Sequence, residues 1–140
     1  MDLNKSQMGK YVVDTHALLW FLMGSSQLSD RAKSILEDAN NQLIIPAIVL
    51  AEAIWITRHK KALAITSQAV MAAMNADSRI EIYPLNLAVI ERTMKAEAIK
   101  EMHDRQIVST VLVLQEAGEE VALVTCDRNI VESALVSTVW

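Results

Sequence analysis

Short apolar runs rich in β-branched residues alternate with longer segments of helical periodicity along the whole chain. The expected strands are 10–14, 42–45, 80–83, 121–125 and 136–140. The expected helices are 16–24, one opening at Ser29 or Asp30 with an apolar stripe that runs to Ala39, 47–60, 66–76, 87–99, 104–117 and 128–134. Strands joined through helices pair in parallel, because the crossover returns the chain to the same end of the sheet. The pattern therefore predicts an α/β domain with a mostly parallel sheet covered on both faces.

Composition agrees with one well-ordered domain. The chain has 140 residues, of which 52% are hydrophobic and 21% charged, and it contains only three Gly and two Pro. This length suits a single domain over 1–140 with a real core, and the polar residues 1–9 read as a flexible N-terminal extension.

Several locations are disfavoured. The first residues lack the apolar stretch of a secretory signal, and no apolar run reaches the length of a membrane span. The lone Cys126 excludes an internal disulfide and suits a reducing compartment. We therefore expect a cytoplasmic protein.

The net charge of −4, from 17 acidic and 13 basic side chains, is unusual for a protein that binds nucleic acid. Carboxylates clustered around a metal ion would explain part of it, since bound divalent cations cancel their charge. The net charge therefore neither supports nor excludes a nucleic-acid substrate.

Two acids lie where parallel sheets collect ligands. Asp14 ends the first expected strand and Asp127 follows the strand 121–125 closely. Ligands of such sheets bind beyond the carboxyl ends of the strands. Each aspartate also precedes an expected helix, so an N-cap is the alternative interpretation of either one.

Two further acids stand in unusual surroundings. Glu52 is in the middle of an expected helix, with four apolar residues before it and four after, although one exposed helix face would also accommodate it. Asp104 opens another helix, where an N-cap or an ion pair with Arg105 would equally explain it. Several carboxylates converging in space are what Mg2+ and Mn2+ prefer as ligands.

Four stretches together resemble one known family. They are VVDTHALLW at 12–20, AE at 51–52, DRQIVST at 104–110 and LVTCD at 123–127. In this order and spacing they resemble the PIN-domain family, in particular the VapC-type toxins of prokaryotic toxin–antitoxin pairs. The resemblance runs from about residue 11 to residue 140. The chain departs from many members at Glu101-Met102-His103, where a proline is common, and at Cys126.

The resemblance implies a PIN-like, Rossmann-like α/β/α sandwich and a metal-dependent endoribonuclease that hydrolyses RNA phosphodiester bonds. It assigns Asp14, Glu52, Asp104 and Asp127 as catalytic ligands of Mg2+ or Mn2+, with Thr125 supporting the pocket. It also implies an RNA substrate, an antitoxin partner and a homodimer.

Some basic residues are candidates for substrate binding. Arg105 and Arg128 flank acids, and Arg58 belongs to the densest basic run, Arg58-His59-Lys60-Lys61. A solvated helix end favoured by the helix dipole is the alternative for that run. His16 and His103 are weaker candidates for a general base.

Two rival functions remain open at the level of sequence. One is a stand-alone PIN-domain nuclease without an antitoxin, and the other is a non-catalytic acidic-pocket module that binds Mg2+ or RNA. Trp20, Phe21 and Trp55 are compatible with an exposed groove for a partner helix, and equally with core packing.

Overall fold

The computed structural model describes residues 9–60 and 63–140, so most of the expected N-terminal extension and Lys61 lie outside the described residues. The strands are β1 (Lys10–Val13), β2 (Gln42–Pro46), β3 (Ile80–Tyr83), β4 (Val121–Val124) and β5 (Thr138–Val139). The helices are α2 (Thr15–Met23), α3 (Asp30–Glu37), α4 (Ala47–His59), α5 (Ser67–Ala76), α6 (Leu87–Thr93), α7 (Met102–Glu116) and α8 (Arg128–Ser133).

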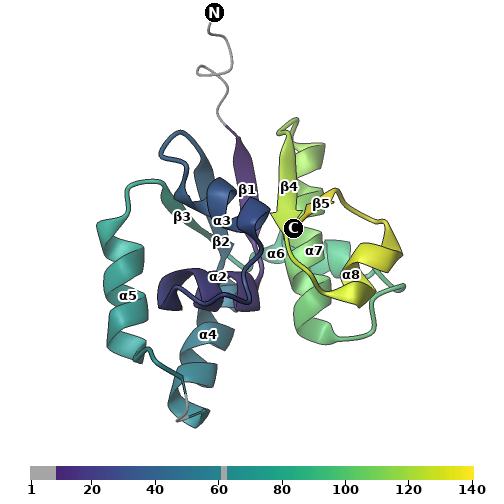
Figure 1. Cartoon of the computed structure of the whole chain (residues 1–140). Coiled ribbons are helices and arrows are strands. Elements are labelled where there is room, and N and C mark those ends of the chain that lie inside the picture. Colours follow the sequence, from purple (N-terminus) through teal and green to yellow (C-terminus); the bar gives the residue numbers. More distant parts are fainter. Residues whose placement is uncertain (1–8, 61–62) are drawn as a thin grey trace, which may run out of the picture.

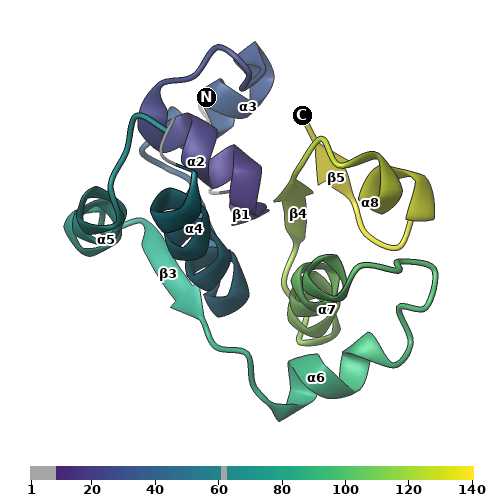
Figure 2. The same cartoon turned by 90° about the horizontal axis from the view of Figure 1, so that it is seen from below.

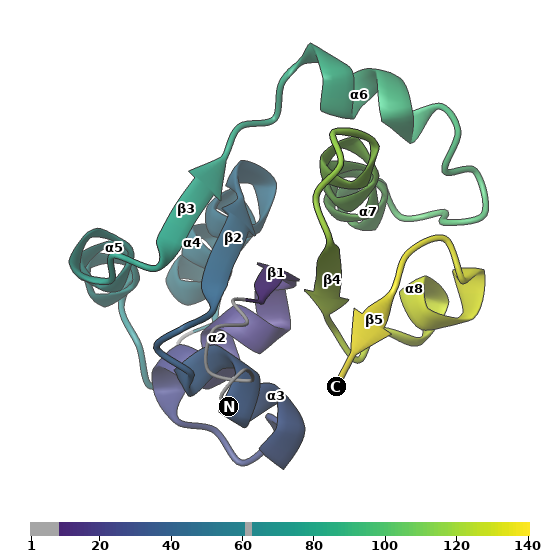
Figure 3. The same ribbon diagram turned by 90° about the horizontal axis from the view of Figure 1, so that it is seen from above.

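The strands form one five-stranded sheet in the order β3-β2-β1-β4-β5, and every neighbouring pair is parallel (Figure 1). Strand β1 lies at the centre, where Val12 pairs with Ile44 on one side and Leu123 on the other. Helices α2 and α3 lie on one side of the sheet, and α6 and α7 lie on the other (Figures 2 and 3). The predicted α/β/α architecture is confirmed.

The central strands are apolar because both of their faces are covered. Val12, Val13 and Ile45 are completely buried, as are Leu123 and Val124 of β4. Burial on both faces explains why these strands read as continuous apolar runs rather than alternating ones.

Most predicted helices are present, with shifted ends. Helix α2 stops at Gly24, whose left-handed φ of 66° caps the helix. Helix α7 begins two residues before the predicted Asp104, because the Glu101 carboxylate accepts a hydrogen bond from the Asp104 amide at 2.9 Å. The helix predicted over 87–99 was too long: α6 ends at Thr93, and the irregular segment that follows buries Ala96 and Ile99 completely. Ala39 lies beyond the end of α3 and is exposed, so its place on a buried stripe was wrong.

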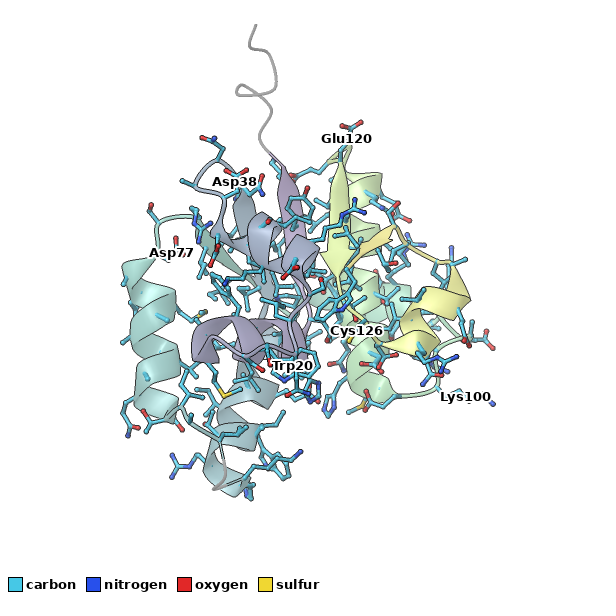
Figure 4. All side chains as sticks on the ribbon, viewed as in Figure 1. Trp20, Asp38, Asp77, Lys100, Glu120 and Cys126 are labelled. Carbon is cyan, nitrogen blue, oxygen red and sulfur yellow. The ribbon has the colours of Figure 1, made fainter. Side chains whose placement is uncertain are left out.

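All five strands point the same way, so their carboxyl ends form one edge, which Figure 2 views directly. Cys126, just after β4, lies at this edge, whereas Asp38 and Glu120, before β2 and β4, lie at the opposite edge (Figure 4). Helix α4 contacts both α2 and α7. Within the described ranges, no helix is long and apolar enough to cross a membrane.

At the amino-terminal edge, Arg79 joins three segments. Its guanidinium donates to the carbonyl oxygens of Leu36 and Asp38, both at 2.8 Å, and to the carboxylate of Asp77. The hydrogen bonds from Arg79 hold the pKa of Asp77 below its usual value. This residue therefore fixes the loop before β2 to the turn before β3.

Replacing Arg79 with Met, which has a similar shape but no donors, should lower the free energy of unfolding by about 2 kcal/mol, because two carbonyls and a carboxylate lose their partner. Urea denaturation measures the change. Arg31→Met, at an exposed position of α3, is the control and should change stability by less than about 0.5 kcal/mol. Equal effects of the two substitutions would contradict the role given to Arg79.

Candidate active site

Asp14 lies where β1 meets α2, and it is only 8% exposed. Its Oδ1 accepts from the Thr15 amide at 2.7 Å, and its Oδ2 accepts from the Thr125 hydroxyl at 2.5 Å. Burial raises the pKa of Asp14, while the bonds from Thr125 and Thr15 act in the opposite direction. Asp14 is the N-cap of α2, as the alternative interpretation predicted. Its carboxylate is nevertheless buried next to other acids.

Thr125 connects Asp14 to Asp127. Its hydroxyl donates to Asp14 and accepts from the Asp127 amide at 3.0 Å. Asp127 in turn caps α8, since its Oδ1 accepts from the Ile130 amide at 3.1 Å. The negative charge of Asp127 is one cause of the raised pKa of Asp14. These two aspartates therefore face the same space beyond the ends of β1 and β4.

Glu52 reaches this edge from the middle of α4. Its Oε1 accepts from the Thr15 hydroxyl at 2.6 Å, and its Oε2 lies 3.5 Å from His103 Nδ1. The same nitrogen is 3.2 Å from Glu101 Oε2. Glu52 is thus held between the start of α2 and the start of α7, which explains a carboxylate within an otherwise apolar helix.

Asp104 is the acid most affected by its neighbours. Burial, and then the charges of Asp127, Asp14, Glu101 and Glu52, together raise its pKa to about 7. Asp104 is neither the N-cap of α7 nor the partner of Arg105, because Glu101 caps the helix and Arg105 donates to backbone carbonyls instead. The structure therefore brings together all four acids that the sequence singled out.

These carboxylates fit a divalent cation in their chemistry rather than in their present spacing. They are all-oxygen donors that repel one another, which is the ligand set that Mg2+ and Mn2+ select. In residues 9–60 and 63–140, however, no three His, Cys, Asp or Glu side chains lie close enough together to hold one ion. The charges of Asp127, Asp14 and Glu52 contribute to the raised pKa of Asp104, so the four acids lie within electrostatic reach of one another.

Two hollows flank the acids. One, of about 460 Å³, is polar in part and lies beside Asp104, with Asn129 and Ser133 from α8 in its wall. The other, of about 530 Å³, lies beside Glu52 and is lined mainly by apolar side chains of α4. A chain-like substrate crossing the acids could therefore occupy space on both sides.

The three arginines singled out from the sequence have different surroundings. Arg105 bonds to the backbone carbonyls of Ile99 and Glu97, so it braces the segment before α7. Arg128 has an 89% exposed side chain and lies 3.9 Å from Glu132, which leaves its charge accessible. Arg58 is exposed in the last turn of α4, six residues after Glu52.

An all-parallel sheet with buried and half-buried carboxylates at its carboxyl edge defines a class of Rossmann-like α/β/α domains that gather acids at one site. The sequence model of the PIN domain matches residues 11–134, and the chain belongs to the PIN domain family. No curated protein sequence matches the chain.

Solved structures share this fold at low sequence identity. VapBC2 from Rickettsia felis, solved with a DNA fragment from its promoter, is 19% identical, with a TM-score of 0.68 over 94% of this chain and 98% of that one. VapBC-1 from nontypeable Haemophilus influenzae is 20% identical, with a TM-score of 0.58 over 92% and 96% of the two chains. VapC20 from Mycobacterium tuberculosis, described as a sarcin–ricin loop cleaving toxin, is 14% identical, with a TM-score of 0.58 over 90% and 96%.

Sequence reasoning missed two residues that organise the site. Thr15 links Asp14 to Glu52, and Glu101 both caps α7 and adds charge beside Asp104. A signal existed for Glu101, since an acid three residues before a helical aspartate is a possible N-cap. Nothing in the sequence indicated that the Thr15 hydroxyl would reach a helix 37 residues away.

Removing the Thr125 hydroxyl in Thr125→Val should lower the free energy of unfolding by about 1–3 kcal/mol, because Asp14 and the Asp127 amide both lose a buried partner. Chemical denaturation checks this. Thr125→Ser keeps the hydroxyl and should retain most of the stability, so a Ser variant as unstable as the Val variant would point to packing instead.

The raised pKa of Asp104 predicts that the metal-free protein loses stability as pH rises. Folded Asp104 holds a proton up to about pH 7, whereas the unfolded chain releases it near 3.8, so the folded state binds more protons between these values. The melting temperature in EDTA should therefore fall from pH 5 to pH 7.5, and Asp104→Asn should fall less. If the melting temperatures of the wild type and Asp104→Asn changed equally with pH, the raised pKa of Asp104 would be contradicted.

Proposed function

We propose that this chain is a metal-dependent endoribonuclease that hydrolyses RNA phosphodiester bonds, and that it is the toxin of a type II toxin–antitoxin pair. The observation that carries the proposal is the gathering of Asp14, Glu52, Asp104 and Asp127 from four separate parts of the chain at one edge of a PIN-family sheet. Burial and the neighbouring negative charges raise the pKa of both Asp14 and Asp104, and such perturbed acids cluster at functional sites.

The proposed cofactor is Mg2+ or Mn2+, and the four acids are its proposed ligands. A divalent ion at such a site supplies a water of lowered pKa and offsets negative charge on the phosphate. Asp14 suits a fixed ligand, since two hydrogen bonds hold its oxygens. Glu52 and Asp104 suit adjustable ligands, because each is only partly buried.

The chain's own residues also hold the site in place. Thr125 orients Asp14 and the backbone of Asp127 together, and Thr15 positions Glu52 against the start of α2. Of the arginines, Arg128 and Arg58 are the better candidates for phosphate contacts because they are exposed, and Arg105 acts through the segment it braces.

The toxin role rests on family membership and on the solved neighbours. Two of them are VapBC assemblies, and a third is described as a sarcin–ricin loop cleaving toxin. We extend this to an RNA substrate, an antitoxin partner, a homodimer and a cytoplasmic location for this chain. An antitoxin-like reading frame next to the gene would support the pairing, and its absence would favour a stand-alone nuclease.

Purified protein should cleave RNA when Mg2+ or Mn2+ is present and should stop when EDTA is added, and Asp104→Asn should lower the rate by at least about 100-fold. Asp104 suits this test because its carboxylate takes no part in the hydrogen bonds that hold the fold in the described residues. Gel analysis of a labelled RNA digest provides the measurement.

The matched control is Asp30→Asn, which makes the same chemical change at an exposed position on α3 and should cleave at the wild-type rate. Asp14→Asn should be inactive as well. Equal cleavage by wild type, both site variants and the EDTA-treated enzyme would rule out a metal nuclease at this site.

A further inference from the structure

The three tryptophans have different surroundings, and one of them is unexplained by packing. Trp20 and Trp140 pack edge to face, with ring centroids 5.9 Å apart, and both rest against the core. Trp55 is 58% exposed on α4, one turn beyond Glu52. Of the two interpretations of these residues, core packing holds for Trp20 and Phe21, and Trp55 is left exposed.

Trp55 is held in a fixed orientation by its neighbour His59. The two rings stack with centroids 4.0 Å apart and planes 18° from parallel. The His59 ring is itself tied to α4, since its Nδ1 lies 2.8 Å from the Trp55 carbonyl oxygen. The pair forms a flat, preorganised aromatic plate with indole surface open to solvent.

This plate borders the apolar hollow next to the acids. The hollow holds about 530 Å³, within the size range of pockets for small ligands. Its lining includes the following residues: His16, Ile48, Glu52, Trp55, Lys60 and His103. Glu52 thus belongs both to the acidic site and to the wall of this hollow.

Positive charge gathers at the far end of the plate. Arg58 lies in the last turn of α4, and Lys60 follows the helix and lines the hollow. On a chain with a net charge of −4, a flat aromatic surface with a basic border is a local exception. The combination matches a nucleotide, which offers a base to stack and a phosphate to neutralise.

We propose that the hollow beside Trp55 is a nucleobase subsite, in which an unpaired base next to the phosphate held at the acids stacks on the indole. This inference rests on the proposed function, since it names how the RNA substrate is placed. It also implies a preference for unpaired RNA at the cleavage point, because a base within a duplex could not reach the ring.

A protein helix is the less favoured occupant of this surface. Apolar side chains of α4, among them the 58% exposed Trp55, line this surface, and the wall beside them carries Glu52, His103 and Lys60. An amphipathic helix would bury several of these polar groups, whereas a base needs only the ring face and leaves its phosphates toward the basic border. Because Glu52 belongs to the wall of the hollow, any molecule bound there lies directly beside the acids.

The test compares two probes in EDTA, where no cleavage occurs: a ten-nucleotide single-stranded RNA of mixed sequence, and a ten-unit chain of abasic ribose phosphates. The two probes carry the same phosphates, so the ratio of their affinities isolates the bases. The RNA should quench the tryptophan emission of the wild type, and the abasic chain should not. Trp55→Ala should weaken RNA binding by about 5- to 100-fold, with little effect on the abasic chain.

Trp55→Phe keeps an aromatic face and should bind RNA within about 3-fold of wild type while losing the quench. Met94→Ala removes another exposed apolar side chain, just after α6, and should change the binding of neither probe. An unchanged affinity ratio in Trp55→Ala would overturn the proposal. So would loss of binding to an antitoxin helix by Trp55→Ala with unchanged RNA binding, which would assign the surface to a protein.

The two proposals fail in different ways. If the wild type cleaves RNA and Trp55→Ala leaves the affinity ratio unchanged, only the nucleobase subsite is wrong. If the wild type does not cleave with Mg2+ or Mn2+ but the RNA still quenches Trp55, the nuclease proposal fails and the base subsite is supported. If neither the RNA nor the abasic chain binds, the nucleobase subsite is contradicted.

Discussion

Strand β1 pairs in parallel with β2 on one side and with β4 on the other, and the remaining structure follows from this placement. A central parallel strand must be covered on both faces, so the connecting helices divide between the two sides of the sheet. The carboxyl ends of all strands then meet at one edge. Asp14 and Asp127 reach that edge because their strands end there. Helix α4 adds Glu52 to the same edge, and helix α7 adds Asp104.

The site opposes the forces that stabilise the rest of the domain. Asp14 is buried, and its hydrogen bonds from Thr15 and Thr125 offset part of the cost of removing its charge from water. Burial of Asp104, together with the negative charges of the nearby acids, raises its pKa to about 7. A proton relieves the repulsion between these charges at low pH, and a divalent cation would relieve it at neutral pH. Binding of a cation would therefore stabilise the fold as well as enable chemistry.

The fold class could be predicted from the sequence because buried parallel strands leave continuous apolar runs such as Tyr11–Val13. Asp14 and Asp127 could be located by the same reasoning, whereas Asp104 depended on the family resemblance. Side-chain contacts between distant segments were beyond prediction: the Thr15–Glu52 bond, the bracing role of Arg105 and the exposure of Trp55 depend on how helices pack. The end of α6 was also missed, because Ala96 and Ile99 kept a helical pattern in a segment that is not helical.

The central claim is that the four acids act as one divalent-cation site, and calorimetric titration with Mn2+ tests it most directly. Because the pKa of Asp104 is raised to about 7, Mn2+ binding at pH 7 should release part of a proton, seen as a dependence of the measured heat on the buffer's ionisation enthalpy. The proton release should be smaller at pH 8.5. Asp104→Asn should bind Mn2+ more weakly and should release no proton from this position. No saturable binding, or identical binding by Asp104→Asn, would contradict the claim.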